Sequence, residues 1–555
     1  MSYFKKYSQL TACIFLMLMW VFPDHISPWN TFLQEAFACI GFALLWGGRS
    51  FTLIPIRIYI FLLLLIIISL LQYGLGIISF GDFIFLILVS TYCCMSSSLG
   101  ALSFVEQRDV MSFGNISKID IVFLTILFAA LINSIVGLAQ WQGVEQGMFM
   151  YPSKGRVYGN IAQPNQLATL LLMALVSLLY FDINKKVREV WLYSAAAILV
   201  FTLVATQSRT GALSITILAV AVFFIKNFRS SLCWISASLL LYWVLYIKWG
   251  DISNALGGSA AREFIGLSTT RYKLWEQIYA AISERPLIGW GWLNLGAAQQ
   301  EFAVSIGGVE NMDHAHNLFL DLIIWFGVPV GGIIVLALIF WLWKSLFFNF
   351  FVKGNDKSAI TAQCAVLLIF PIAIHSMLEY PFAYMYFMLP TVFFMGVVEG
   401  DAKFLKIISM WFRKLIWVLV FISLILSVVI GKEYFQIEND FKAALLEENF
   451  YTKENELHQY SDLPLILNQY YELVKVLRTT PSSDIDDEDL EIARVISKRF
   501  PWLITIRQYY LFLLKLGKCD EAKNQKLIIE SLFGRFGVLK ADEYSIKYNL
   551  NGICN

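Results

Sequence analysis

Two histidines separated by one residue, His314 and His316, interrupt an otherwise apolar chain of 555 residues that contains five histidines in all. They end a long polar segment, and an apolar run begins directly after Asn317. Residues two apart point the same way on an extended segment but diverge on a helix. The two imidazoles can therefore act together only if the segment is not helical. This pattern predicts the mouth of an active site beside the start of a helix.

The histidine pair has three interpretations. One imidazole could be a general base, because its pKa lies near neutrality. The pair could instead bind a metal with Asp313, Asp321 or Glu310, but zinc sites use three or four ligands and no third His or Cys is close in the sequence. Both histidines could also simply cap a helix or lie in a loop. We expect neither a metal nor a cofactor.

Three arginines could hold an anion beside this pair. Arg156 lies in a glycine-flanked loop, Arg209 lies between two apolar runs, and Arg271 lies on a stretch with helical spacing of apolar residues. Guanidinium groups donate paired hydrogen bonds that match phosphate oxygens. Arg209 could alternatively reach lipid headgroups, since charges next to hydrocarbon are costly, and Arg271 could belong to a solvated helix face.

Neutral polar residues near these charges are of the kind that binds sugars. Asn160, Gln163 and Asn165 follow the loop of Arg156, and Asn317 follows the histidine pair. A further group, His375, Glu379 and Tyr380, lies between two apolar runs, and we expect it to line the access route of an acceptor or a lipid.

Composition determines which elements carry these groups. Hydrophobic residues make up 58% of the chain and charged residues 15%, whereas soluble proteins carry roughly 25% charged residues. Apolar runs of roughly 20 residues, long enough for a transmembrane helix, recur along the chain. We predict an all-α, polytopic transmembrane bundle of about thirteen spans, at 9–22, 31–46, 56–72, 83–104, 119–139, 165–181, 190–205, 211–225, 232–247, 317–343, 359–375, 382–398 and 415–431. A net charge of +1 gives no indication of nucleic-acid binding.

The basic residues orient the predicted bundle. With the N-terminus in the cytoplasm, every inner connection contains Lys or Arg, whereas the outer connections near 23–30, 73–82 and 376–381 contain none. This asymmetry predicts an N-in, C-out topology. It places the histidine pair and a long loop at 248–316 on the outer face.

The last part of the chain differs in composition. We predict a transmembrane domain at 1–431 and a soluble outer domain at 432–555, whose helical patterns are amphipathic and acidic. Residues 511–522 resemble the turn of a TPR-like helix pair, although a small helical domain without repeats fits equally well. Cys519 and Cys554 are the only cysteines of this region, and an oxidising compartment favours a disulfide between them.

Five segments together resemble the O-antigen ligase superfamily. They are His-Ala-His-Asn-Leu-Phe-Leu at 314–320 followed by Phe326, Gly327 and Gly331; Ser-Arg-Thr-Gly at 208–211; Arg271 and Trp275 leading to Pro-Leu-Ile-Gly-Trp-Gly at 286–291; and the segments 159–168 and 375–387. The last two are similar to the PglL-type bacterial protein O-oligosaccharyltransferases, which also carry a soluble C-terminal extension.

The resemblance implies a metal-independent enzyme in the bacterial inner membrane with a periplasmic active site. It would transfer a preassembled glycan from undecaprenyl diphosphate to a Ser or Thr of a periplasmic protein such as a pilin, with inversion. The family histidine falls on His316, with His314 in reserve, and the phosphate-binding arginines fall on Arg209 and Arg271.

Three other functions share parts of this pattern. A ligase acting on lipopolysaccharide core has the same histidine and arginine motifs, but not the segment 375–387 or a tail of this size. A repeat-unit polymerase is also related. A lipid-glycan flippase needs outer arginines, but it needs no base and should work from both leaflets.

Overall fold

The computed structural model describes residues 2–47, 51–109, 116–144, 155–258, 269–307, 311–352, 354, 356–400, 405–450 and 464–554. Glu310, one of the candidate metal ligands, lies outside these residues.

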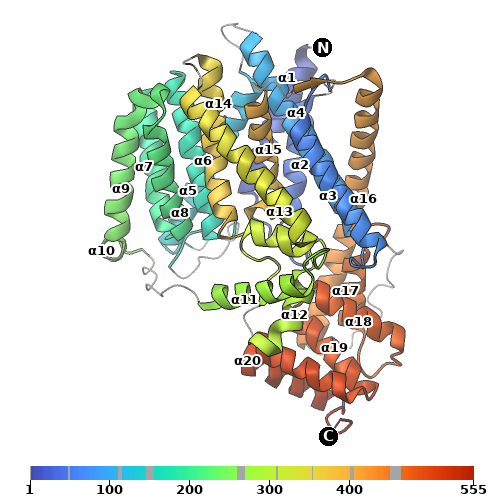
Figure 1. The fold of residues 1–555 in the computed structure, drawn as a ribbon. Helices are drawn as coiled ribbons and strands as arrows, with labels where there is room; N and C mark the ends of the chain where they lie inside the picture. Colours follow the sequence, from blue (N-terminus) through green and yellow to red (C-terminus); the bar gives the residue numbers. More distant parts are fainter. Residues whose placement is uncertain are drawn as a thin grey trace.

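Apolar helices form one bundle (Figure 1). They are α1 (Ser2–Val21), α2 (Phe32–Trp46), α3 (Ile56–Gly74), α4 (Asp82–Asp109), α5 (Lys118–Trp141), α6 (Pro164–Ile183), α7 (Glu189–Ala205), α8 (Arg209–Phe223), α9 (Leu232–Ile247), α13 (Leu318–Phe347), α14 (Lys357–Ser376), α15 (Met385–Glu399) and α16 (Met410–Phe450). Short elements between them are β1 (Leu53–Pro55), η1 (Lys226–Ser231), η2 (Phe348–Val352), η3 (Pro381–Ala383) and β2 (Leu405–Ile407), and β1 pairs antiparallel with β2.

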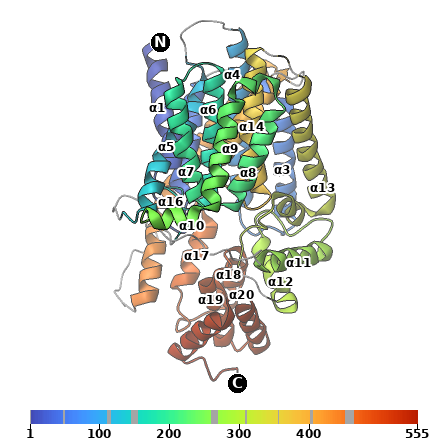
Figure 2. The ribbon, with the colours of Figure 1, turned by 90° about the vertical axis from the view of Figure 1, so that its left-hand side faces the viewer.

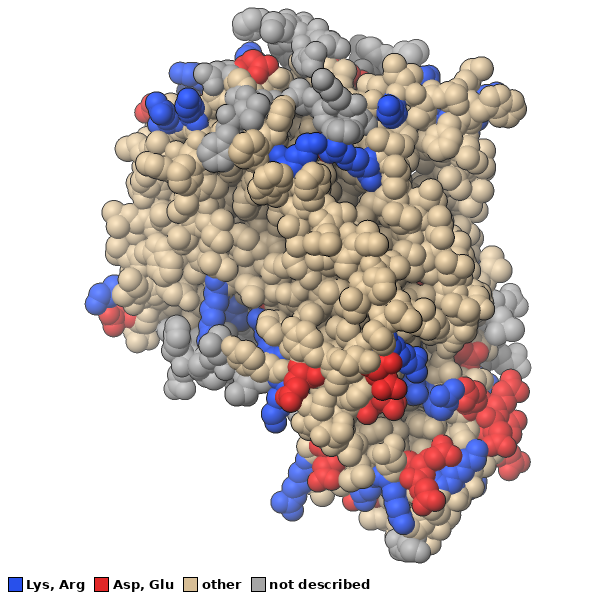
Figure 3. All heavy atoms as spheres, in the orientation of Figure 1, with Lys and Arg blue, Asp and Glu red and all other residues tan. Residues whose placement is uncertain are grey.

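On the face shown in Figure 3, a wide belt of the bundle is nearly free of charged side chains, and the charged side chains gather above and below it. Among the described residues, eight helices are long and apolar enough to cross a membrane, and five further apolar helices are shorter. The window of α6 is 89% buried and that of α3 only 22%, so α6 is central and α3 faces outward. The chain is therefore a multi-pass membrane protein. Each of the thirteen predicted spans overlaps one of these helices, but the number that cross stays a prediction.

Small residues allow the central helices to approach closely. A Cβ added at Gly100 of α4 would collide with the carbonyl oxygen of Phe393 in α15, and one at Gly396 of α15 would collide with the carbonyl oxygen of Ser97. Close backbone contact at small residues is the usual way to pack helices in a membrane, where apolar burial alone does not drive their association.

The span predicted at 317–343 overlaps the apolar helix α13, but this helix is broken near its start. The backbone of α13 is non-helical at Gly327, with φ 79° and ψ 166°, so a short segment ending at Phe326 precedes the long one. Such a positive φ is accessible to glycine at little cost. The N–H of Val328 donates to the carbonyl of Pro286 at 2.7 Å, and Pro329 follows within the first turn, where its missing N–H is tolerated.

The two ends of the chain lie at opposite ends of the bundle (Figures 1 and 2). The connection after α9 holds α10 (Trp249–Ala255), α11 (Thr269–Glu284) and α12 (Leu295–Ile306), which lie at the same end as the tail. The tail adds α17 (Asn468–Arg478), α18 (Asp487–Arg499), α19 (Leu503–Lys515) and α20 (Cys519–Lys547).

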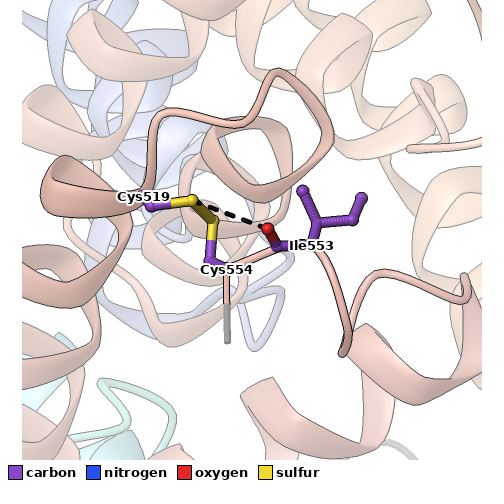
Figure 4. The surroundings of a disulfide bond; sticks show 3 residues. All are labelled: Cys519, Ile553 and Cys554. Atoms are coloured by element: carbon purple, nitrogen blue, oxygen red, sulfur yellow. Dashed lines mark hydrogen bonds between the residues drawn. A yellow bond between two sulfur atoms is a disulfide. The ribbon is translucent and has the colours of Figure 1, made fainter.

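The tail has its own apolar core, but its first helix is shared with the bundle. Helix α16 continues through the predicted boundary at residue 431, and buried side chains from Ile430 onward belong to the core of the tail. Helices α19 and α20 are joined by a turn at Gly517, with φ 67°. The TPR-like character of this pair stays a prediction. The Sγ atoms of Cys519 and Cys554 are bonded, and their Cα atoms are 5.2 Å apart (Figure 4).

Candidate active site

The segment 311–317 before α13 is not helical, which is the condition for its two histidines to act together. Its main chain is fixed on both sides of Ala315: the indole of Trp275 in α11 donates to the Ala315 carbonyl at 3.0 Å, and the Ala315 N–H donates to Asp321 Oδ1 at 2.9 Å. His316 has φ 53°, an uncommon left-handed conformation for a residue with a side chain. Backbone strain of this kind clusters at functional sites.

The turn at 286–291 supports the break in α13 through backbone contacts. The N–H groups of Trp290 and Gly291 donate to the carbonyls of Ile324 and Trp325 at 2.8 and 3.1 Å. Gln72 of α3 donates to the Trp325 carbonyl at 2.6 Å. A Cβ at Gly289 would lie 2.6 Å from the Gly327 nitrogen, so only glycine fits this crossing. The turn at 286–291 thus holds the short segment that follows the histidines.

His314 is buried and held on several sides. Its Nδ1 lies 3.3 Å from Asp321 Oδ2, and its ring stacks on Tyr380 with centroids 4.6 Å apart. The ring of Trp325 lies 5.7 Å away. These contacts fix the orientation of the imidazole.

His316 has the opposite surroundings. Its Nε2 lies 3.2 Å from the sulfur of Met312, and among the described residues its buried Nδ1 has no hydrogen-bond partner. A thioether sulfur can accept a hydrogen bond, although weakly, but it cannot donate one. The Nε2 atom that faces it therefore carries the proton, and Nδ1 carries the lone pair. Burial lowers the pKa of His316, Glu379 opposes this, and the positive charge of Arg271 lowers the pKa further. His316 is therefore neutral at pH 7 and has a basic nitrogen available.

Glu379 is the centre of the polar network beside the histidines. Its carboxylate accepts hydrogen bonds from Gln163 and from Asn165, the latter at 2.5 Å. Arg271 Nη2 lies 3.5 Å away and His375 Nε2 lies 3.4 Å away. Burial raises the pKa of Glu379, but the hydrogen bonds and charge of His375, together with both amides, lower it overall to about 2. The carboxylate is therefore charged at all physiological pH values.

Asn165 connects this network to the arginine motif of α8. Its Oδ1 accepts from Ser208 at 2.7 Å and from Arg156 Nη2 at 3.2 Å. Ser208 is the N-cap of α8 and Arg209 is the first residue of that helix. The N-termini of α6 and α8 thus meet at this side chain, and helix N-termini favour anions.

The structure brings most of the sequence-predicted residues to one place. Tyr380 touches both histidine rings, with the His316 ring 5.2 Å away, and Asn317 donates to the Met377 carbonyl at 3.1 Å. Arg209 is exposed at the start of α8. His375 is fully buried and bonds Thr169 at 2.8 Å.

Two predicted binding residues form hydrogen bonds to backbone carbonyls and so connect parts of the bundle. Asn160 is buried, and its side-chain nitrogen donates to the Val21 carbonyl at 2.8 Å. Arg156 Nε donates to the Thr206 carbonyl at 2.9 Å, which ties its loop to the end of α7. Their binding of substrate stays a prediction.

Sequence reasoning gave Asp321 only as a candidate metal ligand and missed its contact with His314. Asp321 is fully buried, and it is the only ionisable residue between 317 and 343, a signal that marks functional positions in apolar segments. Thr169, by contrast, gives no signal in the sequence. In the part of the chain that the structure describes, no group of three His, Cys, Asp or Glu residues is arranged to hold a metal.

Three family models match consecutive parts of the chain. An O-antigen ligase model matches residues 194–336, a protein glycosylation ligase model matches 157–181, and a model described as the C-terminal part of a virulence-factor membrane-bound polymerase matches 363–535. The first two cover the Arg209, Arg271 and histidine motifs and the start of α6. The third runs from α14 into the tail.

Two relatives from Acinetobacter baylyi (strain ATCC 33305 / BD413 / ADP1) are similar over most of the chain. A general O-oligosaccharyltransferase is 25% identical over 544 residues, 93% of this chain and 90% of the relative. A ComP-specific O-oligosaccharyltransferase is 27% identical over 409 residues, 71% of each chain.

Proposed function

Because this chain belongs to the O-antigen ligase superfamily and to its PglL-type group, we propose that it catalyses O-linked protein glycosylation by en bloc transfer of an oligosaccharide. The donor is a glycan on undecaprenyl diphosphate, and the acceptor is the hydroxyl of a Ser or Thr in a pilin-like periplasmic protein. The reaction requires no metal and inverts the anomeric carbon.

One observation carries this proposal: His316, whose buried Nδ1 has no partner among the described residues, lies near enough to the positive charge of Arg271 for that charge to lower the pKa of the imidazole. Tyr380 contacts the rings of His314 and His316, and the adjacent Glu379 holds Arg271. The ion pair engages one Nη of Arg271 at 3.5 Å, and a guanidinium has five N–H donors. Arg271 is therefore positioned by the protein while retaining donors for phosphate oxygens.

The proposed reaction is a single displacement. Nδ1 of His316 takes the proton of the acceptor hydroxyl, whose oxygen forms a bond to the anomeric carbon. The bond from that carbon to the diphosphate oxygen breaks, and its electron pair leaves with undecaprenyl diphosphate. Arg271 and Arg209 stabilise the charge that grows on the leaving group, an effect of the kind worth roughly 3–4 kcal/mol per donor.

His314 is the reserve candidate for the base. Asp321 at 3.3 Å from its Nδ1 suits an imidazole that receives a proton. Its burial and its stacking on Tyr380 suit instead a side chain that shapes the site. We assign the base to His316 because its Nδ1 is unpartnered among the described residues.

The remaining parts of the proposal concern location. We propose thirteen crossings in the bacterial inner membrane, with the N-terminus in the cytoplasm and the tail in the periplasm. The domain 1–431 carries the reaction, and the helical domain 432–555, with the Cys519–Cys554 disulfide, is periplasmic. In support, the tail, α11 and α12 lie at one end of the bundle and the N-terminus lies at the other (Figure 2).

The function is tested by co-expressing the chain with a lipid-linked glycan and a candidate pilin and measuring the pilin mass. We expect a mass increase equal to one intact glycan with the wild type, and none with Arg271→Gln. Lys273→Gln, which removes an exposed charge two residues away, is the matched control and should be active. Activity that EDTA abolishes would contradict the metal-independent mechanism.

A repeat-unit polymerase is the second candidate, because the polymerase model matches residues 363–535. A polymerase would lengthen the lipid-linked glycan without a pilin present, and a core ligase would transfer it to lipopolysaccharide. A flippase would move it without forming a new bond. Analysing the lipid, lipopolysaccharide and pilin fractions of the same cells therefore separates all four functions.

A further inference from the structure

A hollow lies between the bundle and the tail, and none of the histidines lines it. It is a cavity of about 180 Å³ bounded by the turn between α3 and α4, by the segment 285–297 and by α18. All of its lining residues lie within the described parts of the chain.

The charged residues that line this cavity are mostly basic. Arg285, Arg494, Lys498 and Arg499 line it, against a single acid, Asp82. Arg499 is neutralised by Asp82 at 3.0 Å.

The other three cations are only partly compensated. Arg494 is paired with Glu491, which does not line the cavity. Within the described ranges, neither Arg285 nor Lys498 has an ion pair, and Arg285 lies over the ring of Trp290 at 4.1 Å.

The pKa of Lys498 shows the consequence of this excess of positive charge. Burial lowers its pKa, and the positive charges of Arg494 and Arg285 lower it further, while Glu301 and Glu491 oppose them. Two cations thus face an ammonium group that has no direct counter-charge. An anion placed between Lys498 and Arg285 would relieve this repulsion.

The walls of the cavity are fixed by backbone contacts between the loop and the tail. A Cβ at Gly296 of α12 would lie 2.7 Å from the carbonyl oxygen of Lys498, so the two helices touch there. Gln300 donates to the Ser497 carbonyl at 2.7 Å. The cavity is therefore built by the fold and does not require a ligand to bring its sides together.

Exposed apolar side chains lie close in sequence to the lining residues of the cavity. Leu75, at the end of α3 and next to the lining residue Gly76, is 68% exposed, and Leu287 is 70% exposed. Trp290 and Trp292 line the cavity, as suits the interface between water and lipid. An acidic peptide would leave these apolar groups in water, whereas acyl chains would cover them.

We propose that this cavity binds the phosphate group of an anionic phospholipid, with Arg285 and Lys498 as its ligands and the acyl chains beside α3. The bound lipid braces the segment that supports the active site. Trp292 lies 4.8 Å from Trp325, and Trp325 lies 5.7 Å from His314. The proposal concerns binding, so it stands or falls independently of glycan transfer.

The test is native mass spectrometry of the full-length protein in detergent, with lipid added back. We expect the wild type to retain one phosphatidylglycerol in preference to phosphatidylcholine. The double variant Arg285→Gln, Lys498→Gln should bind phosphatidylglycerol about 30-fold more weakly, from two lost cationic contacts. The charge-matched control Lys515→Gln, Lys523→Gln changes exposed residues of the tail and should bind as the wild type does.

A charge-conserving variant, Arg285→Lys with Lys498→Arg, separates lost charge from a disturbed fold and should retain the lipid. Competition by inorganic phosphate would show that free phosphate also occupies the same site. Equal retention of both lipids, an unchanged affinity of the double variant, or competition only by an acidic peptide would overturn the proposal.

Discussion

Glu379 and His316 lie in the same site, yet the carboxylate of Glu379 has many hydrogen-bond partners and the Nδ1 of His316 has none among the described residues. The carboxylate of Glu379 is surrounded by two amides and a guanidinium from two other parts of the chain and by the imidazole of His375, four residues before it. The Nδ1 of His316 has no partner among the described residues. A satisfied buried charge holds a structure together, whereas an unsatisfied buried base keeps its lone pair for a reacting proton.

The same contrast appears in the backbone. Glu379 follows the end of α14, and its N–H donates to the His375 carbonyl at 2.8 Å within a regular turn. His316 has a strained left-handed backbone that the contacts of Ala315 and Asp321 maintain. We infer that the region of Glu379 positions the groups and that the segment of His316 carries the chemistry.

Replacing His316 with alanine tests this assignment most directly. We expect the rate of glycan transfer to fall by about 10²–10⁴-fold, because the general base is lost. The melting temperature should stay within about 2 °C of wild type, since a side chain with an unsatisfied nitrogen contributes little net stability. His314→Ala is the comparison. A near-normal rate for His316→Ala together with a larger loss for His314→Ala would transfer the role of base to His314.

Replacing Glu379 with glutamine should produce the opposite combination of effects. Gln163, Asn165, His375 and Arg271 would lose a charged acceptor, at a cost of about 1–3 kcal/mol in unfolding free energy. We expect about a 10–100-fold lower rate, because Arg271 is no longer held, together with a clearly lower melting temperature. Glu543→Gln, an exposed residue of the tail, is the control. An unchanged melting temperature would show that Glu379 does not hold the site together.

The pH dependence of transfer should follow His316 and not Glu379. The pKa of His316 is lowered below its ordinary value of 6.5, so its neutral form persists into mildly acidic solution. Activity should be constant near pH 7 to 8 and fall about ten-fold per unit below the pKa of His316. Glu379, with a pKa of about 2, stays charged over this range.

The stability of the fold should also fall on acidification, because of His316. Between its lowered pKa and 6.5, the unfolded chain binds a proton at this residue and the folded chain does not. The contribution is therefore fully present above pH 6.5 and is lost as the pH falls. Initial rates and melting temperatures measured from pH 4.5 to 8.5 check both effects. A rate that rises on acidification would contradict the role of His316 as base.

The disulfide should have the smallest effect on transfer. Changing Cys519 and Cys554 to serine should leave the rate within about two-fold of wild type, because the bond holds the C-terminal end of the chain, which lies at the end of the tail away from the bundle (Figure 1). Closure of a 35-residue loop suggests about 3–4 kcal/mol of stabilisation of the tail. Limited proteolysis should therefore cleave the variant tail faster. Labelling of both thiols in the isolated, unreduced wild type would disprove the bond.

The sequence was sufficient for features that depend on local pattern. Apolar runs long enough for a bilayer placed a helix at each predicted span. The spacing of His314 and His316 set a condition, that the segment is not helical if both imidazoles act together, and the structure meets this condition. Glycines at 289 and 291 take positive φ values, 69° and 100°, in the turn that follows Pro286. Each of these follows from properties of adjacent residues, which any surrounding structure must respect.

Only the tertiary structure decided how the distant motifs combine. Asn165, Ser208, Arg271 and Glu379 are up to 214 residues apart, and packing of α6, α8, α11 and α14 brings them into one hydrogen-bonded network. The break at Gly327 was also outside the reach of apolar patterning, because it depends on carbonyl groups of the segment at 286–291. The sequence determines which residues can do the chemistry. Long-range hydrogen bonds determine which of their polar groups already have partners and which imidazole nitrogen keeps its lone pair.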